Sequence, residues 1–319
     1  MKSGNDYQPP VSQLLTYGSC LEIDKKRPNP HNDRIIQDAL AAGPGKESRK
    51  LLDKLQATYL FERWPNYIED LGITSVHIPE LIQMATDEAD EAEIESESLA
   101  VWAPVHAWRC LGFLKAESAI EPLLGLLKYE DDDWIREEVS WVLAMIGARA
   151  IAPASLYLAS RKYEDSARTS ALMALEYIAQ LHPTLKATCI KKIGSQLADF
   201  KNNSISLNGF LVSSLVELEA TDKANLIERA YASGNVDDSI CGNWPMVQID
   251  MGLADEDDFE PHELEPEYQW VRDEPISPRK YQKPTGLALP TKQVKKKTSQ
   301  ATGFGNSQTT GDKKKKKKR

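Results

Sequence analysis

The chain has 319 residues, an apolar fraction of 41% and a formal net charge of −9. This length is enough for one large domain or two smaller ones with an ample core. An acidic balance argues against a generic nucleic-acid-binding domain, which would carry a basic face. No stretch approaches the roughly 18 apolar residues of a membrane span, and the first residues lack the apolar core of a secretory signal. We therefore expect a cytoplasmic protein without membrane contact.

The charge is distributed unevenly along the chain. Residues 292–319 contain eleven Lys or Arg and a single Asp, a net charge of +10, which leaves −19 for residues 1–291. The four cysteines (Cys20, Cys110, Cys189 and Cys241) form no CxxC pair and match no zinc-ligand spacing. We therefore expect the cysteines to be small, buried apolar residues of a protein in a reducing compartment, and we expect no metal site.

Residues 1–46 are predicted to form an N-terminal helical cap. The segment VSQLLTYG is typical of a short helix that ends at Gly18, and a loop with Pro28 and Pro30 follows it. A second short helix is expected over RIIQDAL, before the strong break at Gly43-Pro44-Gly45.

Residues 47–99 are interpreted as a divergent first repeat followed by an acidic loop. Leu51, Leu55 and Tyr59 have helical spacing, and Pro65 ends that helix or bends the chain. The stretch 86–97 contains seven acidic residues and little that can pack, so we predict a solvated loop there. A site for a cation or a basic partner is the alternative.

A pattern of helical repeats fills residues 100–253. Asp133-x-x-Arg136 followed by Leu143 returns 32 residues later as Asp165-x-x-Arg168 followed by Leu175. Apolar residues spaced by three and four positions form one stripe on each first helix, and a further stripe returns 40 residues later at Leu215. A fixed period in this range is typical of stacked helix pairs. The prediction is an all-α solenoid of about four to six helix pairs.

Glycine and proline mark the expected turns of this repeat. Gly112 and Gly147 lie near the predicted ends of first helices, and Pro122 and Pro153 near the starts of second helices. The segment that begins at Asn243-Trp244-Pro245 is expected to cover the last helix as a C-terminal cap.

Residues 254–319 are predicted to be a disordered extension. Ten acidic residues lie within 254–274, a Pro-rich stretch follows, and the end is rich in Lys, Ser, Thr and Gly. Such a composition offers too little apolar surface to offset the entropy lost on ordering.

The repeat resembles the short HEAT-like repeats of the phycobilisome-lyase type. The resemblance covers about residues 100–232 and is carried by Asp132-x-x-Ile135-Arg136, Leu143, Ile146-Gly147 and Ala150-Ile151-x-Pro153. It implies an α–α superhelix. The chain is also similar to bacterial HEAT-repeat proteins that often end in a Cys-rich, Lys-rich zinc motif. Its own Lys-rich end contains no cysteine, so we expect no zinc there.

Six residues are candidates for a partner-binding patch, because Trp and Arg are enriched at interaction hot spots and two of the arginines, Arg136 and Arg168, occupy matching positions of the repeat. The six are Trp102, His106, Arg109, Trp134, Arg136 and Arg168. Structural roles are the alternative for all of them. The tryptophans would then pack in the core, and the two repeat arginines would bond neighbouring carbonyls or the acids Asp133 and Asp165.

We find no catalytic motif. His106 and Cys110 share a helix face, but a nucleophilic pair would also need an activated thiolate and an oxyanion site. The acids Asp131–Asp133 and Glu137-Glu138 at a helix start are explained by capping and by the helix dipole. We therefore expect neither catalytic residues nor a cofactor.

The expected function is a non-enzymatic scaffold that binds an unidentified protein through one surface of the solenoid. One alternative is a ribosome- or RNA-associated factor whose basic run neutralises phosphates. This run comprises Lys313, Lys314, Lys315, Lys316, Lys317, Lys318 and Arg319. A second alternative is implied by the resemblance alone. It is a bilin lyase-like factor that attaches or detaches a linear tetrapyrrole on cysteines of a partner protein.

Overall fold

A computed structural model describes residues 9–26, 37–38, 40–41, 64–87, 98–129 and 133–264. All of them belong to one compact unit, residues 1–282. The described residues are helical or irregular and contain no strand, so the chain is all-α over this part.

The helices are short to medium in length and follow one another with brief turns. The α-helices are α1 (Cys20–Lys26), α4 (Tyr67–Leu71), α5 (Ile78–Ala85), α6 (Ala103–Phe113), α7 (Ile120–Leu126), α8 (Asp133–Ile146), α9 (Ala148–Ala159), α10 (Asp165–Leu181), α11 (Lys186–Leu197), α12 (Ile205–Glu217), α13 (Ala224–Ala232), α14 (Asp238–Cys241) and α15 (Trp244–Asp250). The 3-10 helices are η1 (Ser12–Thr16), η4 (Ser75–His77), η5 (Leu99–Trp102), η6 (Glu117–Ala119), η7 (Pro183–Leu185), η8 (Thr221–Lys223), η9 (Glu256–Asp258) and η10 (Pro261–Leu264).

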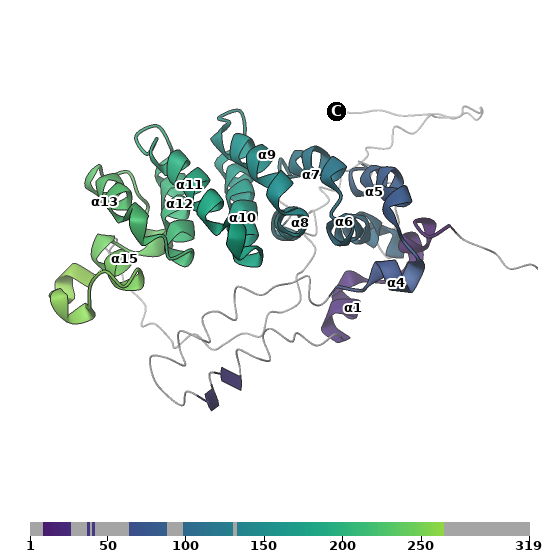
Figure 1. The fold of residues 1–319 in the computed structure, drawn as a ribbon, viewed down its shortest axis with the longest axis horizontal. Helices are drawn as coiled ribbons and strands as arrows, with labels where there is room; N and C mark the ends of the chain where they lie inside the picture. Colours follow the sequence, from purple (N-terminus) through teal and green to yellow (C-terminus); the bar gives the residue numbers. More distant parts are fainter. Residues whose placement is uncertain are drawn as a thin grey trace, which may run out of the picture. The chain divides into compact units, whose positions relative to one another are not determined.

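Alternate helices pack side by side in two rows. In the first row α6, α8, α10 and α12 contact one another in chain order, and in the second row α7, α9, α11 and α13 do the same. Helices α8 and α10 each pack against the second-row helix before them and the one after them. Figure 1 shows that the helices within each row follow one another in chain order, from blue at α6 to green at α13.

The core lies between the two rows and contains the apolar positions that the repeat predicts. Leu111, Leu143, Leu175 and Leu215 take the same place on the four first-row helices, and all four are fully buried. Full burial of one such side chain stabilises a fold by about 1.5–3 kcal/mol. The predicted stripes are therefore confirmed as the packed faces of these helices.

The turn after α6 differs from the one that the sequence predicts. Gly112 lies inside the helix, and Lys115 takes the left-handed conformation instead, with φ 49°. The place of Gly112 is explained by packing, because a Cβ there would lie 3.0 Å from the Met145 sulfur of α8. Gly147 does occupy a left-handed turn, with φ 85°, between α8 and α9.

Pro153 is also placed differently from the prediction. It lies inside α9, five residues after the helix begins at Ala148, rather than in the first turn. A proline there cannot donate the usual backbone hydrogen bond. The helix nevertheless continues to Ala159, and its residues Ala150, Ala154 and Leu158 are buried in the core.

Both ends of the described chain contain structure that the sequence did not predict. Helix α1 occupies residues 20–26, where we expected a loop toward Pro28. At the other end, residues 256–264 contain two 3-10 helices inside the stretch predicted to be disordered. The Asn243 side chain accounts for part of this order, because it caps α15 and donates a hydrogen bond to the Glu263 carbonyl at 2.7 Å. Residues 265–319 and most of 27–63 lie outside the described residues.

Within the part of the chain that the structure describes, no helix is both long enough and apolar enough to cross a membrane.

Candidate interaction surface

A buried arginine on α6 is the centre of a polar cluster near the N-terminal end of the rows. The Arg109 side chain is fully buried, and its Nε donates to Oε2 of Glu138 on α8 at 2.8 Å. A second, very short contact joins Arg109 Nη2 to Oε1 of the same carboxylate. Trp108 Nε1 also donates to Glu138 at 3.0 Å. The Arg109 guanidinium carbon lies over the Trp64 ring, 4.9 Å from the ring centroid. This ion pair therefore joins α6 to α8.

His106 lies one turn earlier on the same helix and is satisfied at both ring nitrogens. Its Nε2 lies 2.9 Å from the carbonyl oxygen of Gly18, which can only accept, so Nε2 carries the proton. Nδ1 then accepts from the Tyr67 hydroxyl at 2.8 Å. The ring is consequently held as one neutral tautomer.

The electrostatics of the cluster keep its cysteine and histidine uncharged. Burial lowers the pKa of His106 to about 4, although the hydrogen bond to Gly18 opposes this shift. Burial raises the pKa of the Cys20 thiol well above its usual range, although Arg109 opposes this shift. Cys20 Sγ lies 3.6 Å from His106 Nδ1, so this contact joins a thiol and a neutral imidazole. It is not a thiolate–imidazolium pair of the kind that nucleophilic catalysis uses.

The opposite side of the cluster is supplied by residues 9–26, which we call the N-terminal segment. Its Asp24 carboxylate receives Arg109 Nη2 at 2.8 Å and Nη1 at 3.1 Å. Its Tyr17 hydroxyl donates to Asp70 at 2.7 Å. The segment also buries Val11 and Leu14 where η1 packs on η5 and α6.

The face that receives this segment is formed by α6, α8 and the chain around α4. We call it the Arg109 surface, and it comprises Trp64, Tyr67, His106, Trp108, Arg109 and Glu138. Its polar groups are bonded to one another as well as to the segment. These mutual contacts hold the side chains of the surface in place, and groups that are already ordered lose little entropy on binding.

Three residues of the predicted partner-binding patch are found at this place, but none of them is exposed. His106 and Arg109 are fully buried, and Trp102 is 7% exposed in η5, which packs against the N-terminal segment. His106 and Arg109 contact Gly18 and Asp24 of the chain's own N-terminal segment, which covers the surface that we predicted for a partner. The side chain of Trp134 lies outside the described residues.

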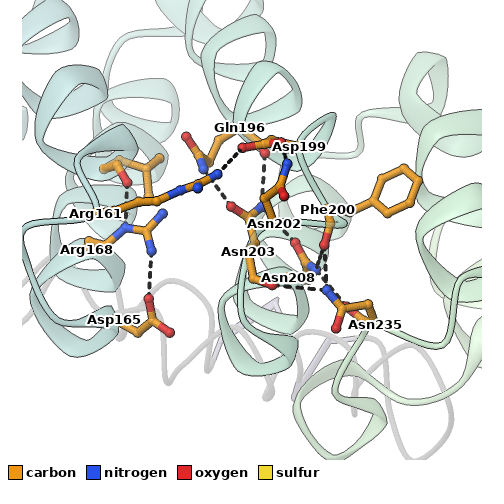
Figure 2. Close-up of polar contacts among 11 residues, drawn as sticks. Arg161, Asp165, Arg168, Gln196, Asp199, Phe200, Asn202, Asn203, Asn208 and Asn235 are labelled. Carbon is orange, nitrogen blue, oxygen red and sulfur yellow. Dashed lines mark hydrogen bonds and ion pairs between the residues drawn. The ribbon is translucent and has the colours of Figure 1, made fainter.

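Arg168 has the structural role that is the alternative to partner binding. Its side chain is only 5% exposed, with Nε donating to the Leu158 carbonyl at 2.8 Å and Nη1 to Asp165 at 2.7 Å. It thus ties the start of α10 to the end of α9 (Figure 2). Arg136 is partly exposed on α8, and its backbone carbonyl accepts from Ser140.

An asparagine takes the place of this arginine in the next unit. Asn208 lies 40 residues after Arg168, is fully buried, and donates to the carbonyls of Phe200 and Asn235 at 2.8 and 2.7 Å. Its Oδ1 accepts from Asn203 at 2.8 Å. Figure 2 shows this network in the turns between helices, beside the ion pair of Arg161 and Asp199. Arg168 and Asn208 therefore each bond the turn beside their helix, from matching positions of two successive units.

The sequence alone did not indicate that Asp24, Tyr67 and Glu138 belong to the cluster. Glu138 was interpreted as one of a pair of acids at a helix start, yet it is only 3% exposed. A signal was present, because Glu138 lies three and four positions before the apolar residues Trp141 and Val142. A carboxylate on an apolar stripe indicates a buried ion pair. No local signal points to Asp24, which is 85 residues from Arg109 in sequence.

The cysteines and acids of the described residues form no further candidate site. All four cysteines are free thiols, and three of them are buried. Among the residues that the structure places, there is no group of three or more His, Cys, Asp or Glu side chains able to hold a metal ion. The lysines of 313–318 and Arg319 lie outside the described residues.

Comparison with known proteins gives no match to a family model, to a curated protein or to a solved structure.

Proposed function

We propose that the chain is a non-enzymatic helical-repeat scaffold that binds another protein, and that its stacked helix pairs form a HEAT-like superhelix. The observation that carries this proposal is the Arg109 surface. It holds a separate stretch of the chain through an ion pair, a carbonyl contact and buried apolar side chains. Such a combination of a preformed face and specific anchors is typical of segment recognition between proteins.

Helix pairs in rows also suit this role physically. Each pair contacts its neighbours, so the rows present a long face that requires little ordering when a partner binds. The resemblance of residues 100–232 to HEAT-like repeats supports the same function, because stacked repeats of this kind act as extended binding surfaces.

The test is affinity capture from the native cell lysate with two baits, the full-length chain and residues 1–291, each with and without nuclease. We expect a discrete set of proteins that both baits retain and that nuclease does not release, identified by mass spectrometry. Ribosomal proteins that are lost with nuclease, or with residues 292–319, would instead support the RNA-associated alternative and contradict the scaffold.

A further inference from the structure

The N-terminal segment contacts the Arg109 surface in the way that a bound peptide contacts its receptor. Val11, which directly precedes η1, and Leu14 on η1 are three positions apart and buried, and so is the small side chain of Cys20. His106 donates a hydrogen bond to the backbone carbonyl of Gly18, and Arg109 donates to the carboxylate of Asp24. The contacts thus combine apolar anchors with two directional polar contacts.

The surface keeps its own charge balance without the segment. Glu138 already neutralises Arg109 through two contacts, and Trp108 adds a further hydrogen bond to that carboxylate. His106 likewise keeps the Tyr67 hydroxyl as a partner when Gly18 is removed. Departure of the segment therefore leaves no buried ion without a counter-charge, which is the usual penalty for breaking such a contact.

Departure does expose apolar surface. Val11, Leu14 and Cys20 are almost completely shielded from solvent in the described structure, and their counterparts on η5 and α6 lose that cover with them. Departure of the N-terminal segment is thus favourable only when another segment covers the same face. Because residues 27–63 link the segment covalently to Trp64, its local concentration is high, and a partner in trans has to compete with it.

We propose that residues 9–26 are a built-in, displaceable ligand of the Arg109 surface. This inference rests on the proposed scaffold function and names the partner's chemistry. The protein partner presents a segment with two apolar side chains three positions apart, a small side chain further on, and a carboxylate four positions after the small one. Binding of that segment replaces the chain's own and releases residues 9–26 from the surface.

The probe for this proposal is a fluorescein-labelled synthetic peptide with the sequence of residues 9–26, and the receptor is the full-length protein. The chain with Leu14→Ser and Asp24→Asn lacks one apolar anchor and the ion pair of its own segment. We expect this loosened chain to bind the peptide at least about tenfold more tightly than the wild type, measured by fluorescence anisotropy. The matched control, Leu15→Ser with Glu22→Gln, changes two exposed positions of the same segment and should bind like the wild type.

Two further measurements decide whether the recognition is specific and whether the loosened chain is folded. A peptide with Asp24→Asn should bind the loosened chain about tenfold more weakly than the wild-type peptide. Amide hydrogens of residues 9–26 should exchange faster in the loosened chain, while those of α10 exchange as in the wild type. The proposal is overturned if neither peptide binds, if both bind equally, or if protection of α10 is lost together with that of the segment.

Failure of the displaceable-ligand proposal can be distinguished from failure of the scaffold proposal. If the wild type captures a nuclease-resistant partner that excess peptide does not release, the scaffold function stands. The proposal that residues 9–26 are a displaceable ligand is then contradicted. If the peptide binds the loosened chain as expected but neither chain captures a protein, the Arg109 surface is a peptide site and the scaffold function is wrong.

Discussion

His106 is neutral near pH 7 because the protein buries its ring and satisfies both nitrogens. A second proton would have to enter at Nδ1, which already accepts from Tyr67, beside the permanent positive charge of Arg109. The ring is also surrounded by Tyr17, Cys20 and Gly18. Protonation would therefore disrupt the contacts that join the N-terminal segment to α6.

This arrangement predicts a loss of stability in mild acid. The pKa of His106 is about 4 in the folded chain, against an ordinary value of 6.5. The unfolded chain therefore binds more protons between these values, so the free energy of unfolding falls as the pH falls through this window and the effect levels off below it. The shift corresponds to a loss of up to about 3 kcal/mol.

Urea unfolding of the wild type and of His106→Gln at pH 7, 6 and 5 measures this contribution. Glutamine keeps a donor and an acceptor at this position but does not titrate, so the variant should lack this part of the pH dependence. Parallel curves for the two proteins would show that His106 is not the group responsible.

Asn208 is a second residue whose importance arises from burial. Its side chain makes three hydrogen bonds, with Phe200 and Asn203 in the turn between α11 and α12 and with Asn235 in the turn between α13 and α14. Replacing it by alanine leaves these buried groups with fewer partners. We expect Asn208→Ala to lower the free energy of unfolding by about 2–3 kcal/mol. The control, Asn202→Ala, removes an exposed contact to Asp199 and should change it by less than about 0.5 kcal/mol in urea titration.

At the scale of elements, two helical glycines provide a matched test of how closely helices approach. A Cβ at Gly209 of α12 would lie 2.8 Å from Ile240 Cδ1 and 3.0 Å from the Asp237 carbonyl, whereas a Cβ at Gly125 of α7 meets nothing within 4 Å. Alanine is about 1 kcal/mol better than glycine inside a helix. The two positions therefore separate helix propensity from interhelical packing.

We expect opposite effects from the two substitutions. Gly125→Ala should raise the free energy of unfolding by up to about 1 kcal/mol, because only the helix propensity changes. Gly209→Ala should lower it by about 1–3 kcal/mol, because α14 has to move away from α12. Chemical denaturation of both variants measures the difference, and stabilisation by Gly209→Ala would contradict the close packing described for these helices.

At the scale of the whole molecule, the contacts between helices are made mainly with near neighbours. Helix α10 packs against α8, α9, α11 and α12, whereas α13 near the end of the rows packs against α11 and α15. In such an arrangement stability is close to a sum of local terms, so the two places should respond differently to loss of a core side chain. Leu175 of α10 and Ile227 of α13 are both fully buried and allow this comparison.

Leu175→Ala should reduce hydrogen-exchange protection across α8 to α12 by about 3 kcal/mol. Ile227→Ala should reduce it by a similar amount but only in α13 to α15. Native-state exchange read by mass spectrometry distinguishes the two patterns. An equal loss of protection in α8 for both variants would mean that the rows unfold as one cooperative unit.

The sequence by itself determined the all-α class, the positions of α8 and α10 and the residues of their buried faces. These features are local, because the spacing of Leu143, Leu175 and their neighbours selects one face of each helix whatever lies opposite it. Helix α1, the inner position of Pro153 and the 3-10 turns after Asp255 were not predicted. They depend on contacts with distant segments, which the local pattern does not contain.

Only the tertiary structure decided the candidate surface. The sequence selected His106 and Arg109 as unusual residues on a helix, and it could not show that Asp24 and Gly18 cover them. Ion pairs and carbonyl contacts between residues more than 80 positions apart form only when the chain has folded. Charge and hydropathy along the chain therefore indicate which residues are exceptional, whereas their burial and their partners follow from how the segments pack.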